Sequence, residues 1–126
     1  MHIIFEYLKY NFHSFFSGLA PDCPAYYGNR AACHMMLSQF PQALDDAKTS
    51  VTIDDAFVKG YIRVAKCCIS LGDTTSARQA IEKALSMEPN NTAVLQEKNN
   101  LVTLEKFKED ASNSYNAKDF RKVRSY

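Results

Sequence analysis

Three side chains in the sequence have the types and the spacing to hold an anion: Asn29, Lys59 and Arg63. Asn29 and Arg63 lie 34 residues apart, and Lys59 precedes Arg63 by four, which places both cations on one face of a helix. A carboxylate would relieve the repulsion between the cations, with Arg63 making a forked contact, Lys59 supplying a point charge and Asn29 an amide donor. Lys66 would extend this basic strip. We therefore predict a carboxylate-binding site; the alternative is a solvated helix face.

The elements that would position these side chains follow from an internal repeat. Residues of the same type recur 34 positions apart, and a period of about 34 is typical of a helix-turn-helix solenoid. The predicted fold is therefore all-α, with helix pairs coiled into a right-handed superhelix. The recurring pairs are Tyr27 and Tyr61, Ala31 and Ala65, Cys33 and Cys67, Leu37 and Leu71, and Ala43 and Ala77.

The repeat divides the chain into four predicted segments. Residues 1–23 hold the second helix of a partial repeat, residues 24–57 and 58–91 are complete repeats, and residues 92–126 hold a capping helix and the start of a further repeat. In this register Met1 falls near position twelve of a repeat. We therefore expect the chain to be truncated at both ends.

In the first complete repeat, helices are predicted over 24–37 and 41–53, each opening on a proline, which suits the first turn of a helix. Asp54 and Asp55 make the turn that follows. Small residues are expected to let the two helices approach closely, and larger apolar residues to supply buried surface. The small set is Ala31, Ala32, Ala43 and Ala47, and the larger set is Leu37, Phe40, Leu44, Val51 and Ile53.

In the second repeat, Gly72 and Asp73 are predicted to form the turn, with Gly72 at a positive φ and Thr74 or Thr75 capping the next helix. Apolar periodicity predicts a capping helix from residue 92 to about 111. A helix over residues 7–20 and the start of another at 119–123 are predicted at the two ends.

Charge and cysteine usage exclude several function classes. Fifteen Lys and Arg against 14 Asp and Glu give a net charge of +1, so no nucleic-acid partner is expected. The first 16 residues are interrupted by charges and offer neither a signal peptide nor a membrane span. Four cysteines without a secretory signal predict reduced thiols and a location in the cytoplasm or also in the nucleus.

No cofactor, metal or catalytic activity is predicted. Cys33, His34, Cys67 and Cys68 raise the possibility of a metal site, but they lack paired CxxC spacing, and thiols at helix contacts are commonly core residues. No metalloprotease, phosphate-loop or nucleophile motif occurs either. The sequence therefore indicates a binding protein and not an enzyme.

The segments Tyr26-Tyr27-Gly28-Asn29-Arg30-Ala31-Ala32 and Phe57-Val58-Lys59-Gly60-Tyr61-Ile62-Arg63 resemble the tetratricopeptide repeats of co-chaperones that bind Hsp70 and Hsp90. The resemblance is to DnaJ-related members of this group and covers roughly residues 21–123. Their J domain is not matched, because no His-Pro-Asp triplet occurs in the sequence.

The resemblance implies a carboxylate clamp, in which five Lys, Asn and Arg side chains grip the C-terminal carboxylate and last Asp of a chaperone tail. Asn29, Lys59 and Arg63 match three of the five positions, and Lys66 would meet acidic residues further upstream in the ligand. The other two positions would precede Met1. We expect their absence to weaken binding by about two to four powers of ten.

The implied function is thus that of an adaptor that supports protein folding by binding Hsp70 or Hsp90 C-terminal tails. The alternative is a solenoid scaffold that makes other protein contacts without binding such tails. The sequence does not distinguish Hsp70 from Hsp90, and it leaves the oligomeric state open.

Overall fold

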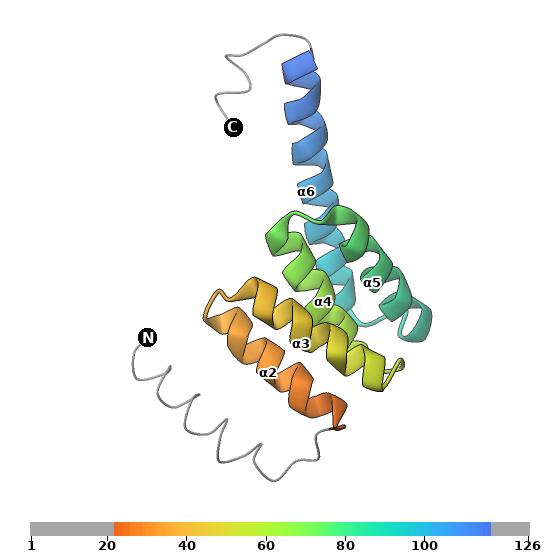
Figure 1. Ribbon diagram of the computed structural model, residues 1–126. Helices are drawn as coiled ribbons and strands as arrows, with labels where there is room; N and C mark the ends of the chain where they lie inside the picture. Colours follow the sequence, from red (N-terminus) through yellow and green to blue (C-terminus); the bar gives the residue numbers. More distant parts are fainter. Residues whose placement is uncertain (1–21, 117–126) are drawn as a thin grey trace.

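Five α-helices follow one another along residues 22–116, the part of the chain described by the structure, which is a computed structural model (Figure 1). They are α2 (Pro24–Met36), α3 (Phe40–Ile53), α4 (Val58–Leu71), α5 (Thr74–Met87) and α6 (Thr92–Asn116). Helices α2 and α3 begin and end within one residue of their predicted bounds, whereas α6 is longer than the predicted capping helix. The helix predicted over 7–20 and the helix start at 119–123 lie outside the described residues.

The helices form two hairpins and a final helix (Figure 1). Helix α2 packs on α3, α3 on α4 and α4 on α5, while α2 also contacts α4. Helix α6 packs against α4 and α5, and its C-terminal part extends past the other helices. The prediction of an all-α helix-turn-helix solenoid is confirmed.

The core consists mostly of small side chains. Ala31 and its repeat partner Ala65 are fully buried, as are Ala43 and its partner Ala77. Larger apolar residues lie partly buried around this core, so the helix axes approach closely along the alanine positions. The buried hydrophobic residues are Ala31, Ala43, Ala47, Val64, Ala65, Cys67, Cys68, Ala77, Ala80, Ile81, Ala84, Val94 and Leu101.

Two residues predicted to supply buried surface do not. Leu37 follows the last turn of α2 and is 37% exposed, and Ile53 ends α3 and is 39% exposed. Both lie at the ends of helices, where the facing helix no longer covers them. The prediction for these two side chains was wrong, whereas Phe40 and Leu44 do pack against the core.

The turns of the two hairpins share one backbone conformation. Gly72, at the end of α4, has a φ of 79°, as predicted, and Ser38, at the equivalent position 34 residues earlier, has a φ of 58°. Left-handed backbone suits glycine and strains other residues. The first hairpin therefore carries a strain that the second avoids.

The cap of α5 differs from the predicted one. The Oδ1 atom of Asp73 accepts a hydrogen bond from the backbone N–H of Ser76 at 3.1 Å, so Asp73 and not Thr74 or Thr75 is the capping residue. The carboxylate satisfies an unpaired amide at the helix N-terminus, and hydrogen bonds from the side chain and the backbone of Ser76 lower the pKa of Asp73.

Gly60 allows α4 to approach α3. A Cβ atom added at Gly60 would lie 2.5 Å from the Ser50 hydroxyl oxygen and 2.6 Å from a methyl carbon of Val51. Both distances are well inside van der Waals contact. Because α4 carries Lys59 and Arg63, this glycine also fixes the position of the predicted site.

We expect Gly60→Ala to lower the free energy of unfolding by about 1–3 kcal/mol, because the added methyl group overpacks the contact between α3 and α4. Chemical denaturation followed by far-ultraviolet circular dichroism measures the change. Ser70→Ala, at an exposed position on the same helix, is the matched control and should change stability by less than about 0.5 kcal/mol. Equal effects of the two substitutions would contradict the packing argument.

We expect Ser38→Gly to stabilise the chain by about 0.5–1 kcal/mol, because glycine relieves the left-handed strain at a small cost in unfolded-state entropy. Ser70→Gly, in right-handed helix, should instead destabilise it by about 0.5 kcal/mol. The same denaturation experiment compares the two, and a loss of stability in Ser38→Gly would show that the turn is unstrained.

Candidate carboxylate-binding groove

A groove of about 570 Å³ runs between α2, α4 and the start of α6. Helix α4 contributes side chains spaced three and four residues apart, which lie on one face of a helix. Apolar and basic side chains share its walls, so it suits a ligand with both apolar groups and negative charge. The lining residues are Ala32, Met35, Met36, Lys59, Ile62, Arg63, Lys66, Asn91 and Ala93.

Three of the four residues in the predicted site lie on this groove: Lys59, Arg63 and Lys66. The fourth, Asn29, is half-buried on α2 and is not among the lining residues. It precedes Ala32 by three residues, so it continues the groove-facing side of α2 by one helical turn. The groove and its extension along α2 thus bring the predicted residues to one surface.

Arg63 has the most unusual environment of the four. Its guanidinium lies against α2, since a Cβ atom added at Gly28 would be 3.5 Å from the Arg63 Nη1 atom. Burial lowers the pKa of Arg63, and the nearby Cys33 sulfur acts weakly in the opposite direction. Within residues 22–116 no carboxylate forms an ion pair with Arg63 or with Lys59. A half-buried cation without a counter-ion is a site at which a ligand anion gains binding free energy.

Lys66 differs because its charge is already paired. Its Nζ atom lies 2.7 Å from Oε1 of Glu97 on α6, and the Glu97 side chain is 4% exposed. The second oxygen of Glu97 accepts a hydrogen bond from Nδ2 of Asn100 at 3.3 Å. The predicted role of Lys66, contact with acidic residues of a ligand, did not include this internal partner.

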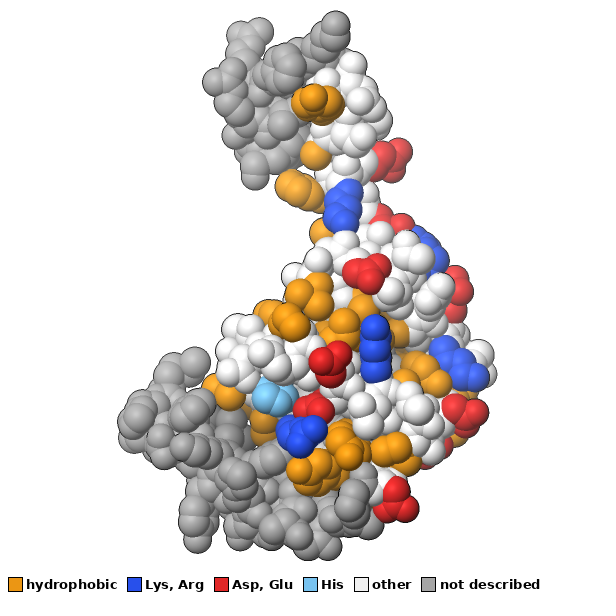
Figure 2. Space-filling model, in the orientation of Figure 1, with side chains coloured by type: hydrophobic (Ala, Val, Ile, Leu, Met, Phe, Trp, Pro, Cys, Tyr) orange, Lys and Arg blue, Asp and Glu red, His pale blue; other side chains and the backbone are white. Residues whose placement is uncertain are grey.

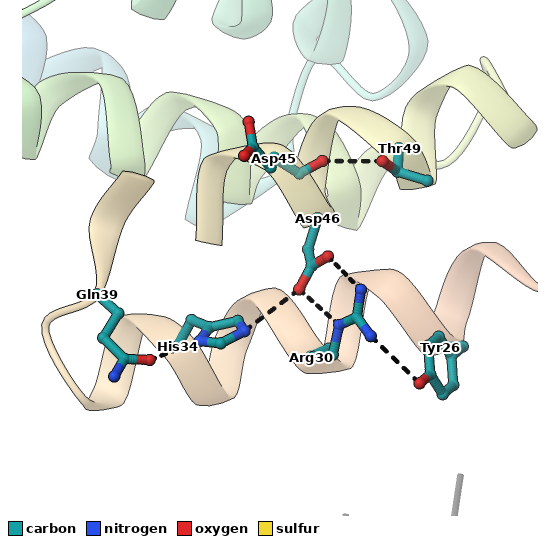
Figure 3. Close-up of polar contacts among 7 residues, drawn as sticks. All are labelled: Tyr26, Arg30, His34, Gln39, Asp45, Asp46 and Thr49. Atoms are coloured by element: carbon teal, nitrogen blue, oxygen red, sulfur yellow. Dashed lines mark hydrogen bonds and ion pairs between the residues drawn. The ribbon is translucent and has the colours of Figure 1, made fainter. Parts of the chain in front are cut away.

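A second polar network joins α2 to α3 (Figure 3). Arg30 donates to both carboxylate oxygens of Asp46, at 2.8 Å and 2.7 Å, and its guanidinium also lies against the ring of Tyr26. This carboxylate raises the pKa of Arg30. His34 places Nε2 3.5 Å from Asp46 and Nδ1 2.7 Å from Oε1 of Gln39. These contacts fix the angle between α2 and α3. They therefore also fix the direction of the groove-facing side of α2.

Sequence reasoning missed this network, although a signal was present. Arg30 and Asp46 lie eight residues before and after Ser38, the centre of the hairpin turn. Antiparallel helices joined by a short turn bring such symmetric positions opposite each other. Opposite charges at these positions therefore indicate an ion pair across the hairpin.

The four cysteines are free thiols. Cys67 and Cys68 are fully buried in the core, and burial raises the pKa of Cys67 to about 11, with a smaller contribution from Cys68. Between residues 22 and 116, no three His, Cys, Asp or Glu side chains gather in a way that could hold a metal ion. The thiols of α4 therefore act as small core side chains.

On the face shown in Figure 2, basic and acidic side chains are interspersed and do not form a continuous basic area. Among the described helices, none has both the length and the hydropathy needed to span a bilayer.

Comparison with solved structures connects this geometry to a family. No protein-family model matches the chain. A TPR domain of Arabidopsis OM64 is 32% identical in sequence and superposes with a TM-score of 0.62, over 65% of this chain and 68% of that domain. The chain belongs to the tetratricopeptide repeat family.

Two further proteins are similar to the chain. Human DnaJ homolog subfamily C member 7 is 39% identical over 114 residues, which is 90% of this chain and 23% of that protein. The chain thus spans about a quarter of this relative's length. The TPR2B domain of yeast Sti1, in a complex with pHsp70, is 27% identical with a TM-score of 0.62, over 69% of this chain and 72% of that one.

We expect Arg30→Met to lower the free energy of unfolding by about 1–3 kcal/mol, because it leaves the buried Asp46 carboxylate without its main partner. Arg78→Met is the matched control. Arg78 pairs with Glu105 but is 51% exposed, so its loss should cost less than about 1 kcal/mol. Thermal denaturation compares the variants, and equal losses would show that the Arg30 network contributes no more than a surface pair.

Proposed function

We propose that this tetratricopeptide repeat chain is an adaptor that binds the acidic C-terminal tails of Hsp70 or Hsp90 and so supports protein folding. The tail's terminal carboxylate would lie at the cationic end of the groove, held by Arg63, Lys59 and Asn29. The observation that carries the proposal is that Arg63 is half-buried and lacks a carboxylate partner within the described residues.

The chemistry of the three side chains supports a terminal carboxylate as the ligand group. The planar guanidinium of Arg63 matches a carboxylate in a bidentate arrangement, and hydrogen bonds to charged groups are the strong ones. Lys59 is exposed on the groove wall and adds a mobile point charge. Asn29 lies one turn further along α2 and offers amide hydrogens.

The relatives support the same partner class. Yeast Sti1 presents a TPR domain in a complex with pHsp70, and this domain superposes on 69% of the chain. DnaJ homolog subfamily C member 7 belongs by name to the DnaJ homologues. A scaffold that does not bind chain ends would not need a guanidinium at the groove that has no carboxylate partner within residues 22–116.

The test is a titration, followed by nitrogen-15 NMR, with an acidic peptide that has a free C-terminal carboxylate and with its amidated twin. NMR detects weak binding and reports on the Asn29 side-chain amide and the Arg63 Nε–H directly. We expect amidation to weaken binding by about 10- to 100-fold, which corresponds to one hydrogen bond to a charged group.

Two arginine variants sharpen this test. Arg63→Ala should remove most of the difference between the two peptides, whereas Arg78→Ala, at an exposed position on α5 outside the groove, should preserve it. Equal binding of the free and amidated peptides by the unmodified chain would rule out carboxylate recognition and favour the scaffold function.

A further inference from the structure

The two ends of the groove differ in charge because of Glu97. At one end Arg63 and Lys59 have no carboxylate partner among the described residues. At the other end Lys66 lies 2.7 Å from the Glu97 carboxylate, so its charge is neutralised within the fold. The basic side chains along α4 are therefore not equivalent, although their spacing in the sequence suggests a continuous strip.

The Lys66 charge cannot be transferred to a ligand at low cost. The Glu97 side chain is 4% exposed, and within residues 22–116 Lys66 is its only cationic partner. Moving Lys66 to a ligand carboxylate would leave Glu97 buried and unpaired, held only by the hydrogen bond from Asn100. Leaving a buried carboxylate without its partner costs more free energy than an exposed ion pair with a ligand contributes.

Most of the uncharged side chains that line the groove with Lys66 are apolar. They include Met35 and Met36 of α2, Ile62 of α4 and Ala93 of α6, while Asn91 is polar. Methionine side chains adapt to ligand groups of different shape, and these surfaces lose contact with water when an apolar side chain fills the groove. This end therefore suits an uncharged side chain.

We propose that Glu97 is a specificity-determining residue: by neutralising Lys66, it makes the groove select an apolar over an acidic residue upstream of the ligand's terminal carboxylate. This inference rests on the proposed function. From Lys59 to Lys66 the rise along α4 is about 10 Å, and an extended peptide covers that length in about three residues. The selected ligand residue thus lies among the three that precede the terminal one.

The experiment uses peptides with a free C-terminal carboxylate and a single Leu or Glu at each of these three positions. At one of the three positions, the unmodified chain should bind the Leu peptide more tightly than the Glu peptide. Glu97→Gln keeps the shape and the contact with Asn100 but frees Lys66, so it should bind the corresponding Glu peptide about three- to fivefold more tightly than the unmodified chain does. Its affinity for the Leu peptide should stay the same.

Two further variants assign the effect. Glu105→Gln removes a partly exposed carboxylate from the same helix, outside the groove, and should leave both affinities unchanged. In the double variant Lys66→Met with Glu97→Gln, the gain for the Glu peptide should disappear. The double variant removes both charges of the pair together and leaves no unpaired charge at the buried Glu97 position, so it should still fold, which circular dichroism checks.

Failure of the inference is distinguishable from failure of the proposed function. If Glu97→Gln changes the affinities for the Leu and Glu peptides equally, or if Glu105→Gln produces the same gain, Glu97 does not set specificity. If Glu97 does not set specificity but every variant still binds amidated peptides more weakly than free ones, carboxylate recognition stands. If no variant distinguishes free from amidated peptides, both proposals fall.

Discussion

Close approach between helices is the constraint on which the rest of this structure depends. Ala31 and Ala65 are buried at equivalent positions of successive repeats, and Gly60 lies directly against Ser50 and Val51. Larger side chains at these positions would force the helices apart, and at Gly60 they would separate α3 from α4. The position of Arg63, close to Gly28 on α2, follows from the same short distance between helices.

The polar contacts have two different purposes. Arg30 and Asp46 pair across the first hairpin and hold α2 on α3, while Lys66 and Glu97 join α4 to α6. Both pairs include a carboxylate that is largely buried. Arg63, by contrast, is placed between α2 and the groove without such a partner among the described residues. The charges that hold the helices together are therefore paired within the fold, whereas the charge of Arg63 is available to a ligand.

Much of this arrangement was predictable from the sequence because it follows from the repeat. The 34-residue spacing indicated the helix pairs and the buried alanines, and the glycine at position 72 indicated the left-handed turn. Spacings of four and three along α4 placed Lys59, Arg63 and Lys66 on one surface. That Asn29, Lys59 and Arg63 bind a carboxylate remains a prediction. The exposure of Leu37 was not foreseen, because periodicity marks an apolar face without showing where the facing helix ends.

Glu97 shows the limit of sequence reasoning most clearly. It lies three residues after Val94 and four before Leu101, so helical spacing places this carboxylate on the buried face of α6. Its partner Lys66 is on a helix two elements earlier. Only the packing of α6 on α4 brings the two side chains together. No spacing rule within a repeat relates the two residues, whereas Arg30 and Asp46 are related by the symmetry of their hairpin.

The pair of like charges on α4 has a consequence for the folding of the chain itself. Lys59 and Arg63 are four residues apart on one helix, an arrangement that slightly destabilises a helix, and Arg63 is also partly removed from water. Replacing either residue with a neutral one would thus relieve an energetic burden of the unliganded fold. In a laboratory evolution experiment that selects for thermal stability alone, we expect one of these two charges to be replaced. Keeping both would require selection for ligand binding as well.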